Sequence, residues 1–339
     1  MDDIENKVCL VTGGAGFIGS ELVRQLLDQR AKVVVYDNML IGSEANIEEV
    51  KSRIKFIKAD IRNKELFAHV LMDESVDYVF NLAAEPYIPH CYERQEDFFN
   101  VNAVGALRVF LACQEAEVKR CIQYSTSEVY GNAKEFPMDE NTKTSPISTY
   151  AASKLAADRL AFTLHHERKV PVIILRQFNC VGPRETQPYV IPEIISQLYH
   201  NGTLLLGNTS ARRDFTFVSD ASKAAIELIK YKEAEGQVYN SGTCMDYSVE
   251  ELAHIIADIM GIGDLKITID KKRLRPLDVE RLQCNFGKLH KLTGWEPETD
   301  IKTALEKTVE YFLNHQNEWI WEKRFPQERV WGRGIYDKE

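Results

Sequence analysis

Short apolar runs of β-forming residues alternate with longer amphipathic segments along the first half of the chain. The apolar runs lie at 8–12, 33–37, 54–60, 77–84, 119–126 and 170–176. Segments near 17–29, 63–72, 96–116 and 149–168 have the length and periodicity of helices. Continuous apolar strands separated by helices are typical of a parallel sheet covered on both faces. The pattern therefore predicts an α/β fold with a doubly wound parallel sheet.

This alternation ends after residue 177. Gly, Pro and Asn interrupt the segment FNCVGPRETQPY, and short mixed elements follow up to a helix near 301–314. We expect a first domain over 1–177 and a smaller second lobe made mainly of 178–339, with 212–230 returning to the first domain. The tail after residue 315 is rich in Trp and charge, and we expect it to cover the second lobe or contact a partner.

Composition excludes several classes of protein. The 339 residues carry a formal net charge of −9, which argues against a nucleic-acid partner bound through its phosphates. The seven cysteines form no CxxC pair and the eight histidines have no metal-ligand spacing, so we predict no metal site and a reducing compartment. The acidic start MDDIENK and the lack of an apolar run of about 20 residues predict no secretory signal, no membrane partner and a cytoplasmic location.

A glycine-rich turn follows the first apolar run. In TGGAGFIGS, Gly13, Gly16 and Gly19 have the spacing GxxGxxG, with a predicted strand before them and a predicted helix after them. Glycine permits a tight turn and close approach of the backbone to a pyrophosphate, which the amides at the helix start also attract. An acid about 20 residues further on, here Asp37, completes the pattern of a Rossmann-type dinucleotide-binding domain.

The acid at the end of the second strand bears on which dinucleotide binds. A carboxylate at Asp37 accepts hydrogen bonds from a ribose diol and repels a 2′-phosphate. The following residues, NMLIGS, contain no Arg or Lys. The sequence therefore predicts NAD as the cofactor. Asp60 closes the third strand, where it would approach the adenine or remain a solvated acid.

A tyrosine and a lysine share one face of a predicted helix. In TYAASKLAAD, Tyr150 and Lys154 are separated by one helical turn. A neighbouring ammonium, together with a cationic nicotinamide ring, would favour the phenolate form of the tyrosine. The pair then suits proton removal from an alcohol while a hydride leaves the same carbon. A solvated surface pair is the alternative interpretation.

Four motifs together resemble one known family. TGGAGFIG, NLAA, STSEVYG and YAASK are similar to the extended short-chain dehydrogenase/reductases, the NAD-dependent epimerase/dehydratase family, and within it to nucleotide-sugar 4,6-dehydratases. RQFNCVGPR, RRDFTFVSD and RPLDVERLQCNFGKLHKLTGWEP match the same branch. The resemblance spans roughly residues 7 to 312. It implies a Rossmann-type sheet followed by a smaller C-terminal lobe that binds a nucleotide-diphosphate sugar.

The resemblance also implies the site residues. The predicted catalytic residues are Thr126, Ser127, Glu128, Tyr150 and Lys154. The predicted cofactor contacts are Gly13, Gly16, Phe17, Ile18, Gly19, Asp37, Asn38, Asp60, Ile61, Leu82, Ala83, Ala84, Asn102, Tyr150 and Lys154. The predicted substrate contacts are Glu85, Thr126, Asn179, Arg213 and Arg275. The two arginines would hold the diphosphate, with surface ion pairing as their alternative, and Asn179 would otherwise be a turn residue.

The triplet TSE raises the question of what Glu128 does. In the reaction that the resemblance implies, a hydride leaves the sugar C4 for NAD, Glu128 takes the C5 proton and aids loss of the C6 hydroxyl, and the hydride returns to C6. The dTDP-glucose dehydratases carry Asp where this chain has Ser127. TSE resembles instead the GDP-mannose dehydratases and some amino-sugar dehydratases, and it also occurs in UDP-glucuronate decarboxylases. A decarboxylase, a 4-epimerase and a non-catalytic dinucleotide-binding regulator therefore remain alternatives, and a charge solvated at a strand end remains the alternative for Glu128.

The resemblance finally implies a homodimer through the helices near 96–116 and 149–168. The first of these segments is apolar on several sides, more than contact with one sheet requires. Complete burial inside a monomer would produce the same pattern.

Overall fold

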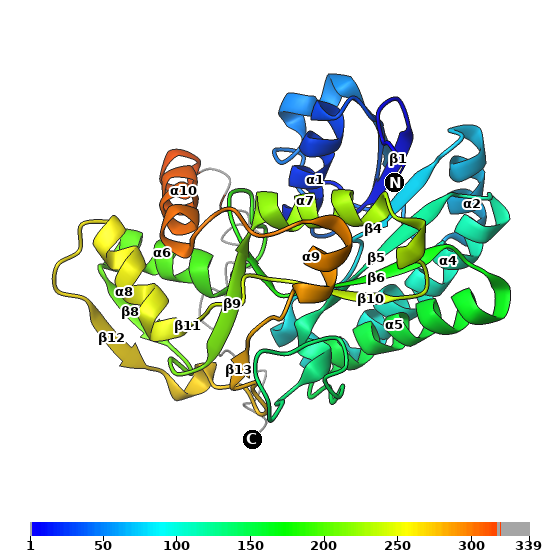
Figure 1. The fold of residues 1–339 in the computed structure, drawn as a ribbon. Helices are drawn as coiled ribbons and strands as arrows, with labels where there is room; N and C mark the ends of the chain where they lie inside the picture. Colours follow the sequence, from blue (N-terminus) through cyan, green and yellow to red (C-terminus); the bar gives the residue numbers. More distant parts are fainter. Residues whose placement is uncertain (1, 317–318, 320–339) are drawn as a thin grey trace.

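The computed structural model describes residues 2–316 and 319. Its larger lobe is built on a seven-stranded parallel sheet with the strand order β10-β6-β5-β4-β1-β2-β3 (Figure 1). The predicted α/β class is confirmed, and each of the predicted strands is present. The strands are β1 (Val8–Thr12), β2 (Lys32–Asp37), β3 (Ile54–Lys58), β4 (Tyr78–Asn81), β5 (Arg120–Thr126), β6 (Val172–Gln177) and β10 (Val238–Ser241).

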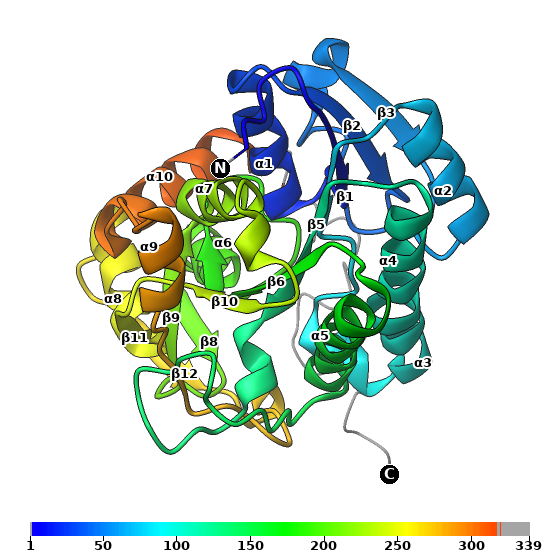
Figure 2. The ribbon, with the colours of Figure 1, turned by 45° about the vertical axis from the view of Figure 1, so that its right-hand side comes forward.

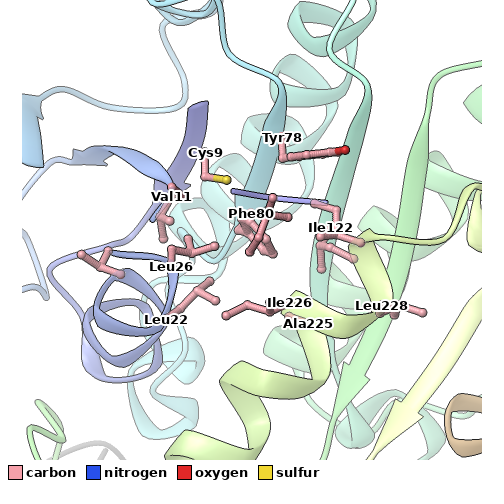
Figure 3. Close-up of a cluster of buried hydrophobic side chains, with 14 of the residues drawn as sticks. Cys9, Val11, Leu22, Leu26, Tyr78, Phe80, Ile122, Ala225, Ile226 and Leu228 are labelled. Atoms are coloured by element: carbon pink, nitrogen blue, oxygen red, sulfur yellow. The ribbon is translucent and has the colours of Figure 1, made fainter. Parts of the chain in front are cut away.

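Helices cover both faces of this sheet (Figure 2). One face carries α1 (Phe17–Asp28), α7 (Val218–Ile229) and α9 (Gly287–Thr293), and the other carries α2 (Lys64–Asp73), α4 (Ala106–Glu115) and α5 (Thr149–Arg168). Successive strand residues point to opposite faces, so Cys9 and Val11 join one core and Leu10 the other. Figure 3 shows the first core, where strand residues meet Leu22 of α1 and Ile226 of α7. Burial on both faces explains why the strands are continuously apolar.

The predicted helix at 96–116 is interrupted. It comprises α3 (Gln95–Phe99), a π-helical segment η3 (Asn100–Gly105) and α4. The predicted helix at 149–168 is continuous as α5, and its start is fixed by Ser148, whose hydroxyl accepts a hydrogen bond from the Ala151 amide at 3.1 Å. Short 3₁₀ helices connect other elements: η1 (Glu48–Arg53), η2 (Ile88–Tyr92), η4 (Ser127–Tyr130), η5 (Lys232–Ala234) and η6 (Lys271–Arg273).

The smaller lobe has its own core. A four-stranded sheet pairs β9 with three neighbours, and a two-stranded sheet lies beside it. Helices α6 (Val190–Asn201), α8 (Val249–Ile259) and α10 (Ile301–Asn314) pack with them (Figure 1). The strands are β7 (Asn179–Val181), β8 (Thr203–Leu206), β9 (Arg212–Phe217), β11 (Asp246–Ser248), β12 (Lys266–Ile269) and β13 (Arg281–Leu282). Trp319 packs into this core, while residues 317–318 and 320–339 of the tail considered above lie outside the described residues.

The segment 212–230 divides between the lobes. Its strand β9 belongs to the smaller lobe, and only its helix α7 packs on the large sheet. Strand β10 and helix α9 also join the larger lobe, although they lie in the half of the chain that the sequence pattern assigned to the second. Short elements such as β10 carry little periodic signal, which explains why the pattern missed them.

Two further observations concern the whole described region. None of its helices has the length and apolar character needed to cross a bilayer. All seven cysteines are free thiols, and most of them are buried, as expected for small apolar side chains.

Candidate active site

A cavity of about 400 Å³ lies at the carboxyl ends of the large sheet's strands and is lined by residues of both lobes. The strand order reverses at β1: β2 and β3 extend to one side of it, and β4, β5 and β6 to the other. Such a switch point is where open α/β sheets bind ligands. The fold therefore places the predicted motifs around one space.

The glycine-rich turn forms one wall of the cavity. Gly13 has a φ of +66°, a left-handed conformation that glycine adopts without strain. A Cβ at Gly19 would lie 2.1 Å from the carbonyl oxygen of Gly13, so no larger residue fits there. The cavity is lined by Gly13, Gly16, Phe17, Ile18 and Gly19, all predicted cofactor contacts. The cavity thus reaches the start of α1, and the N-terminus of a helix is a favourable place for a pyrophosphate.

Asp37 and Asp60 lie at the ends of adjacent strands. The buried Asp37 carboxylate accepts hydrogen bonds from the amides of Ala15 at 3.0 Å and Met39 at 2.8 Å. It thereby ties the glycine-rich turn to β2, in addition to lining the cavity. Asp60 is held by the Arg62 guanidinium at 2.8 Å, and this hydrogen bond is the main cause that lowers the pKa of Asp60 to about 2.

Arg62 bears on the choice of dinucleotide. The sequence places no cation next to Asp37, but the fold brings Arg62 to the Asp60 carboxylate at the end of the neighbouring strand. Because the Arg62 guanidinium pairs with Asp60, the positive charge of Arg62 is already compensated. The contact of Asp37 with a ribose stays a prediction.

The loop after β4 forms another wall of the cavity, and Asn102 hydrogen-bonds to the backbone of this loop at Glu85. Ile61, Leu82, Ala83, Ala84 and Glu85 line the cavity, as do Asn38, Asp37 and Asp60. Asn102 does not: its side chain accepts from the Glu85 amide at 2.8 Å, and donates to the Glu85 carbonyl at 3.0 Å and to Ser153 at 2.9 Å. Asn102 therefore positions the loop, and its direct contact with a cofactor stays a prediction.

Tyr150 and Lys154 both line the cavity beside the end of β5. Burial raises the pKa of the Tyr150 phenol well above its ordinary value, a hydrogen bond with Thr126 lowers it in part, and the Glu128 carboxylate raises it. Burial also lowers the pKa of Lys154 to about 8, and its ammonium donates to the Tyr124 carbonyl at 2.5 Å. Lys154 alone does not offset the burial of the phenol, and the joint effect of the lysine and a nicotinamide ring on the phenolate stays a prediction.

Glu128 is buried, with 9% of its surface exposed, and it lines the cavity. Its backbone amide donates to the Thr126 hydroxyl at 3.2 Å, which fixes the short helix η4 at the end of β5. Its charge raises the pKa of Tyr150 and acts on Arg213 and Arg275, so these groups share one electrostatic environment. A charge solvated at a strand end is therefore excluded for Glu128.

The two predicted arginines converge on one carboxylate. Arg213 donates to Asp278 at 3.3 Å, and Arg275 pairs with the same oxygen at 3.5 Å. Arg213 is only 8% exposed, so the surface ion pair considered for it is excluded, and its partner lies in the cavity wall. Burial lowers the pKa of Arg213. Asn179 also lines the cavity, and its buried Oδ1 has no hydrogen-bond partner in the described part of the chain.

Several lining residues were not identified from the sequence. They include Tyr124 and Gln177 on the large sheet, the segment 185–191, and Asn208, Arg273 and Asp278 on the smaller lobe. Gln177 ends β6, so the rule that ligands bind at strand ends could have identified it. The residues of the smaller lobe carry no motif, and their place at the cavity depends on how the lobes pack. The described residues hold no group of His, Cys, Asp or Glu side chains suited to a metal ion.

Comparisons with known proteins agree with this geometry. The dTDP-D-glucose 4,6-dehydratase of Homo sapiens is 31% identical over 323 residues, covering 92% of each chain. The structure of DesIV, a dTDP-glucose 4,6-dehydratase from Streptomyces venezuelae with NAD and TYD bound, superposes with a TM-score of 0.85 at 28% identity, covering 92% of this chain and 98% of that one. The UDP-glucose 4-epimerase of Thermotoga maritima, solved with UDP-glucose, gives 0.84 at 27% identity over 91% and 99%. The family model described as GDP-mannose 4,6 dehydratase matches residues 10–308, and the chain belongs to this family of extended short-chain dehydrogenase/reductases.

Proposed function

We propose that this protein is an NAD-dependent nucleotide-sugar 4,6-dehydratase, which oxidises C4, eliminates water across C5 and C6, reduces C6 and releases a 4-keto-6-deoxy sugar nucleotide. One observation carries the proposal: the buried Glu128 carboxylate shares a cavity with Tyr150 and with two arginines. Oxidation at C4 needs only the tyrosine and its partners, whereas elimination needs a further acid–base group. The named dehydratase relatives support the same conclusion.

The larger lobe, mainly 1–177, would hold the cofactor and the lobe mainly of 178–339 the sugar nucleotide. The tight turn through Gly13, Gly16 and Gly19 fits the pyrophosphate, and Asp37 fits the adenosine ribose. NAD would supply an acceptor for the C4 hydride and return that hydride to C6. Arg213 and Arg275 would bind the diphosphate as charge-assisted donors.

The chain's own residues would move the protons. Thr126 and Tyr150 are hydrogen-bonded, so both would contact the C4 hydroxyl, with Tyr150 as the base. The Lys154 ammonium, whose pKa is about 8, is mostly protonated at pH 7 and would stabilise the developing phenolate. Glu128 would take the C5 proton and give a proton to the departing C6 hydroxyl, and a proton from solvent would return to C5 as the hydride reaches C6. Ser127 replaces the separate acid of the dTDP-glucose enzymes, so Glu128 would serve twice.

The 4-epimerase remains the second candidate, because an epimerase structure superposes nearly as well as a dehydratase. An epimerase needs no carboxylate beside the sugar, so the burial of Glu128 in the cavity favours the dehydratase. A decarboxylase would carry the same triplet, and only its reaction product distinguishes it.

Product analysis tests the proposal. The purified protein is incubated with NAD and one sugar nucleotide at a time, and the masses of the products are measured by mass spectrometry. The substrates are UDP-, GDP-, dTDP- and CDP-hexoses and UDP-glucuronate. We expect loss of one water from a hexose nucleotide, with NAD returned unchanged. Loss of carbon dioxide from the uronate, or a hexose product of unchanged mass and inverted C4, would assign the protein to the alternatives.

We also propose a homodimer through α3–α4 and α5, and a cytoplasmic location. Phe99 is 41% exposed and Val104 is 38% exposed, while Leu107, Leu111 and Phe162 are half-buried on the same helices. Exposed aromatic and aliphatic side chains on adjacent helices are typical of a surface that a second chain covers. Sedimentation should show a dimer at micromolar concentration, and Phe99→Asp should shift it to monomer. A native protein that sediments only as monomer contradicts the dimer.

A further inference from the structure

A series of contacts between residues of the cavity wall connects Glu128, beside the proposed reacting carbons, with the smaller lobe. The charge of Glu128 acts on Arg213, and Arg213 bonds Asp278. The other Asp278 oxygen accepts from Asn208 at 3.2 Å. The neighbouring Gly207 packs against the next residue along the wall, because a Cβ there would lie 2.6 Å from the Arg273 carbonyl oxygen. Arg273 therefore lies beyond the arginine that would hold the diphosphate, where the nucleoside of a substrate would extend.

At this far end the cavity is lined by a buried ion pair. Glu193 of α6 and Arg273 of η6 are 8% and 9% exposed, and an Arg273 amino group donates to Glu193 Oε1 at 2.9 Å. Gln197 donates to the same oxygen at 2.7 Å. The buried Nε of Arg273 has no hydrogen-bond partner among the described residues, since the Asp270 carboxylate is 3.8 Å away. Around the pair, apolar side chains also line the cavity: Val190, Leu206, Phe215 and Val249.

Stability alone does not account for this pair. A buried ion pair is often no more stabilising than apolar residues of the same volume, because both charges lose their hydration. An unpaired buried donor such as Arg273 Nε costs further free energy. A ligand that brings an acceptor to Arg273 and donors to Glu193 would compensate both costs. The apolar surroundings suit the faces of a planar ring.

We propose that the Glu193–Arg273 pair recognises the base of the sugar nucleotide and selects guanine. This inference rests on the proposed function. Guanine presents one acceptor, O6, beside two donors, N1–H and the amino group, so O6 would meet Arg273 and the donors would meet the free Glu193 oxygen. Uracil and thymine have one N–H between two carbonyls, so a carbonyl would face the carboxylate. Cytosine and adenine offer one amino group to the carboxylate, so we expect their affinities to lie between that of guanine and those of uracil and thymine.

Binding of nucleoside diphosphates tests the inference without turnover. The protein saturated with NAD is titrated calorimetrically with GDP, CDP, UDP and dTDP. We expect GDP to bind at least about tenfold more tightly than UDP or dTDP, as for one well-formed set of base contacts. Glu193→Gln should weaken GDP binding about tenfold and change UDP binding little, because an amide can donate to a carbonyl. Glu250→Gln, an exposed glutamate of α8, is the matched control and should change neither affinity.

Two further readouts make the result decisive. NAD affinity and circular dichroism of Glu193→Gln should equal those of the native protein, since the cofactor site lies on the other lobe. If that variant does not fold, Arg273→Met serves instead, with the same expected loss of GDP preference. Equal binding of GDP and UDP by the native protein, or equal weakening of all four nucleotides by Glu193→Gln, would overturn the inference.

The same experiments separate this inference from the proposed function. Loss of water from any nucleotide sugar, combined with no preference for GDP, would overturn the base assignment and leave the dehydratase intact. A preference for GDP that depends on Glu193, with no loss of water from any GDP-hexose, would support the base assignment and contradict the dehydratase. Failure of all four nucleotides to bind would contradict both.

Discussion

Replacing Lys154 by Met should stabilise the fold while it abolishes most of the activity. Lys154 is 4% exposed, and burial lowers the pKa of its ammonium from the ordinary 10.5 to about 8. The folded protein therefore holds this proton less tightly than the unfolded chain does. A methionine side chain keeps the length of the stem and removes the charge. The Tyr124 carbonyl still accepts a hydrogen bond from Gln123 at 2.8 Å, so no backbone oxygen is left unpaired.

The size of the effect follows from the pKa. The difference between 10.5 and about 8 corresponds to about 3 kcal/mol, since each pKa unit is worth about 1.4 kcal/mol. Asp158 also loses a favourable cation one turn away, although it keeps Arg176 at 2.9 Å. This loss reduces the expected gain in the free energy of unfolding at pH 7 to on the order of 1–2 kcal/mol.

The dependence on pH has a defined sign. Because the pKa is lower in the folded state, the cost of the buried ammonium is complete below pH 8. It declines as pH rises from about 8 to 10.5, where the unfolded chain also loses the proton. The stability difference between Lys154→Met and the native protein should therefore be largest near pH 7 and should shrink toward pH 10.

Urea denaturation of both proteins at pH 7 and pH 10, without added cofactor, measures this difference. Lys302→Met, on an exposed position of α10, should change stability by less than about 0.5 kcal/mol at either pH. Activity of Lys154→Met should fall by about 10²–10⁴, because the phenol of Tyr150 loses its neighbouring cation. A Lys154→Met protein that is less stable than the native one at pH 7, or whose advantage is equal at both pH values, would refute the reasoning.

Three further predictions concern the proposed reaction. Glu128→Gln should spare oxidation at C4 and block elimination by about 10²–10⁴, so that enzyme-bound NADH absorbance accumulates and C5 hydrogen does not exchange with deuterated water; near-normal release of a 4-keto-6-deoxy product would contradict the role. Arg213→Ala should raise KM more than it lowers kcat, with a loss of about 1.5–3 kcal/mol in steady-state kinetics, and an unchanged KM would remove the arginine from the diphosphate site. Protein freed of cofactor should bind NAD more tightly than NADP in a fluorescence titration, because Asp37 repels a 2′-phosphate, and equal affinities would contradict this assignment.

Local patterns along the chain were enough to predict the larger lobe and the residue types at its strand ends. Periodic apolar runs predict β1–β6 because residues buried on both faces must be apolar throughout. The glycine spacing with Asp37, and the one-turn spacing of Tyr150 and Lys154, are local patterns whose geometry follows from one turn and one helix. The triplet that contains Glu128 was likewise visible, because it directly follows a recognisable strand.

Other features of the site became visible only in the folded molecule. That Glu128 is buried beside Arg213, and that both arginines meet Asp278, depends on how the two lobes pack. The rise in the pKa of Tyr150 follows from burial by several segments, which no spacing along the chain reveals. Strand β10 could not be predicted from the sequence either. The same holds for the ion pair of Glu193 with Arg273, which lie 80 residues apart. Such contacts join segments that are distant in sequence, so their physical signal exists only once the chain has folded.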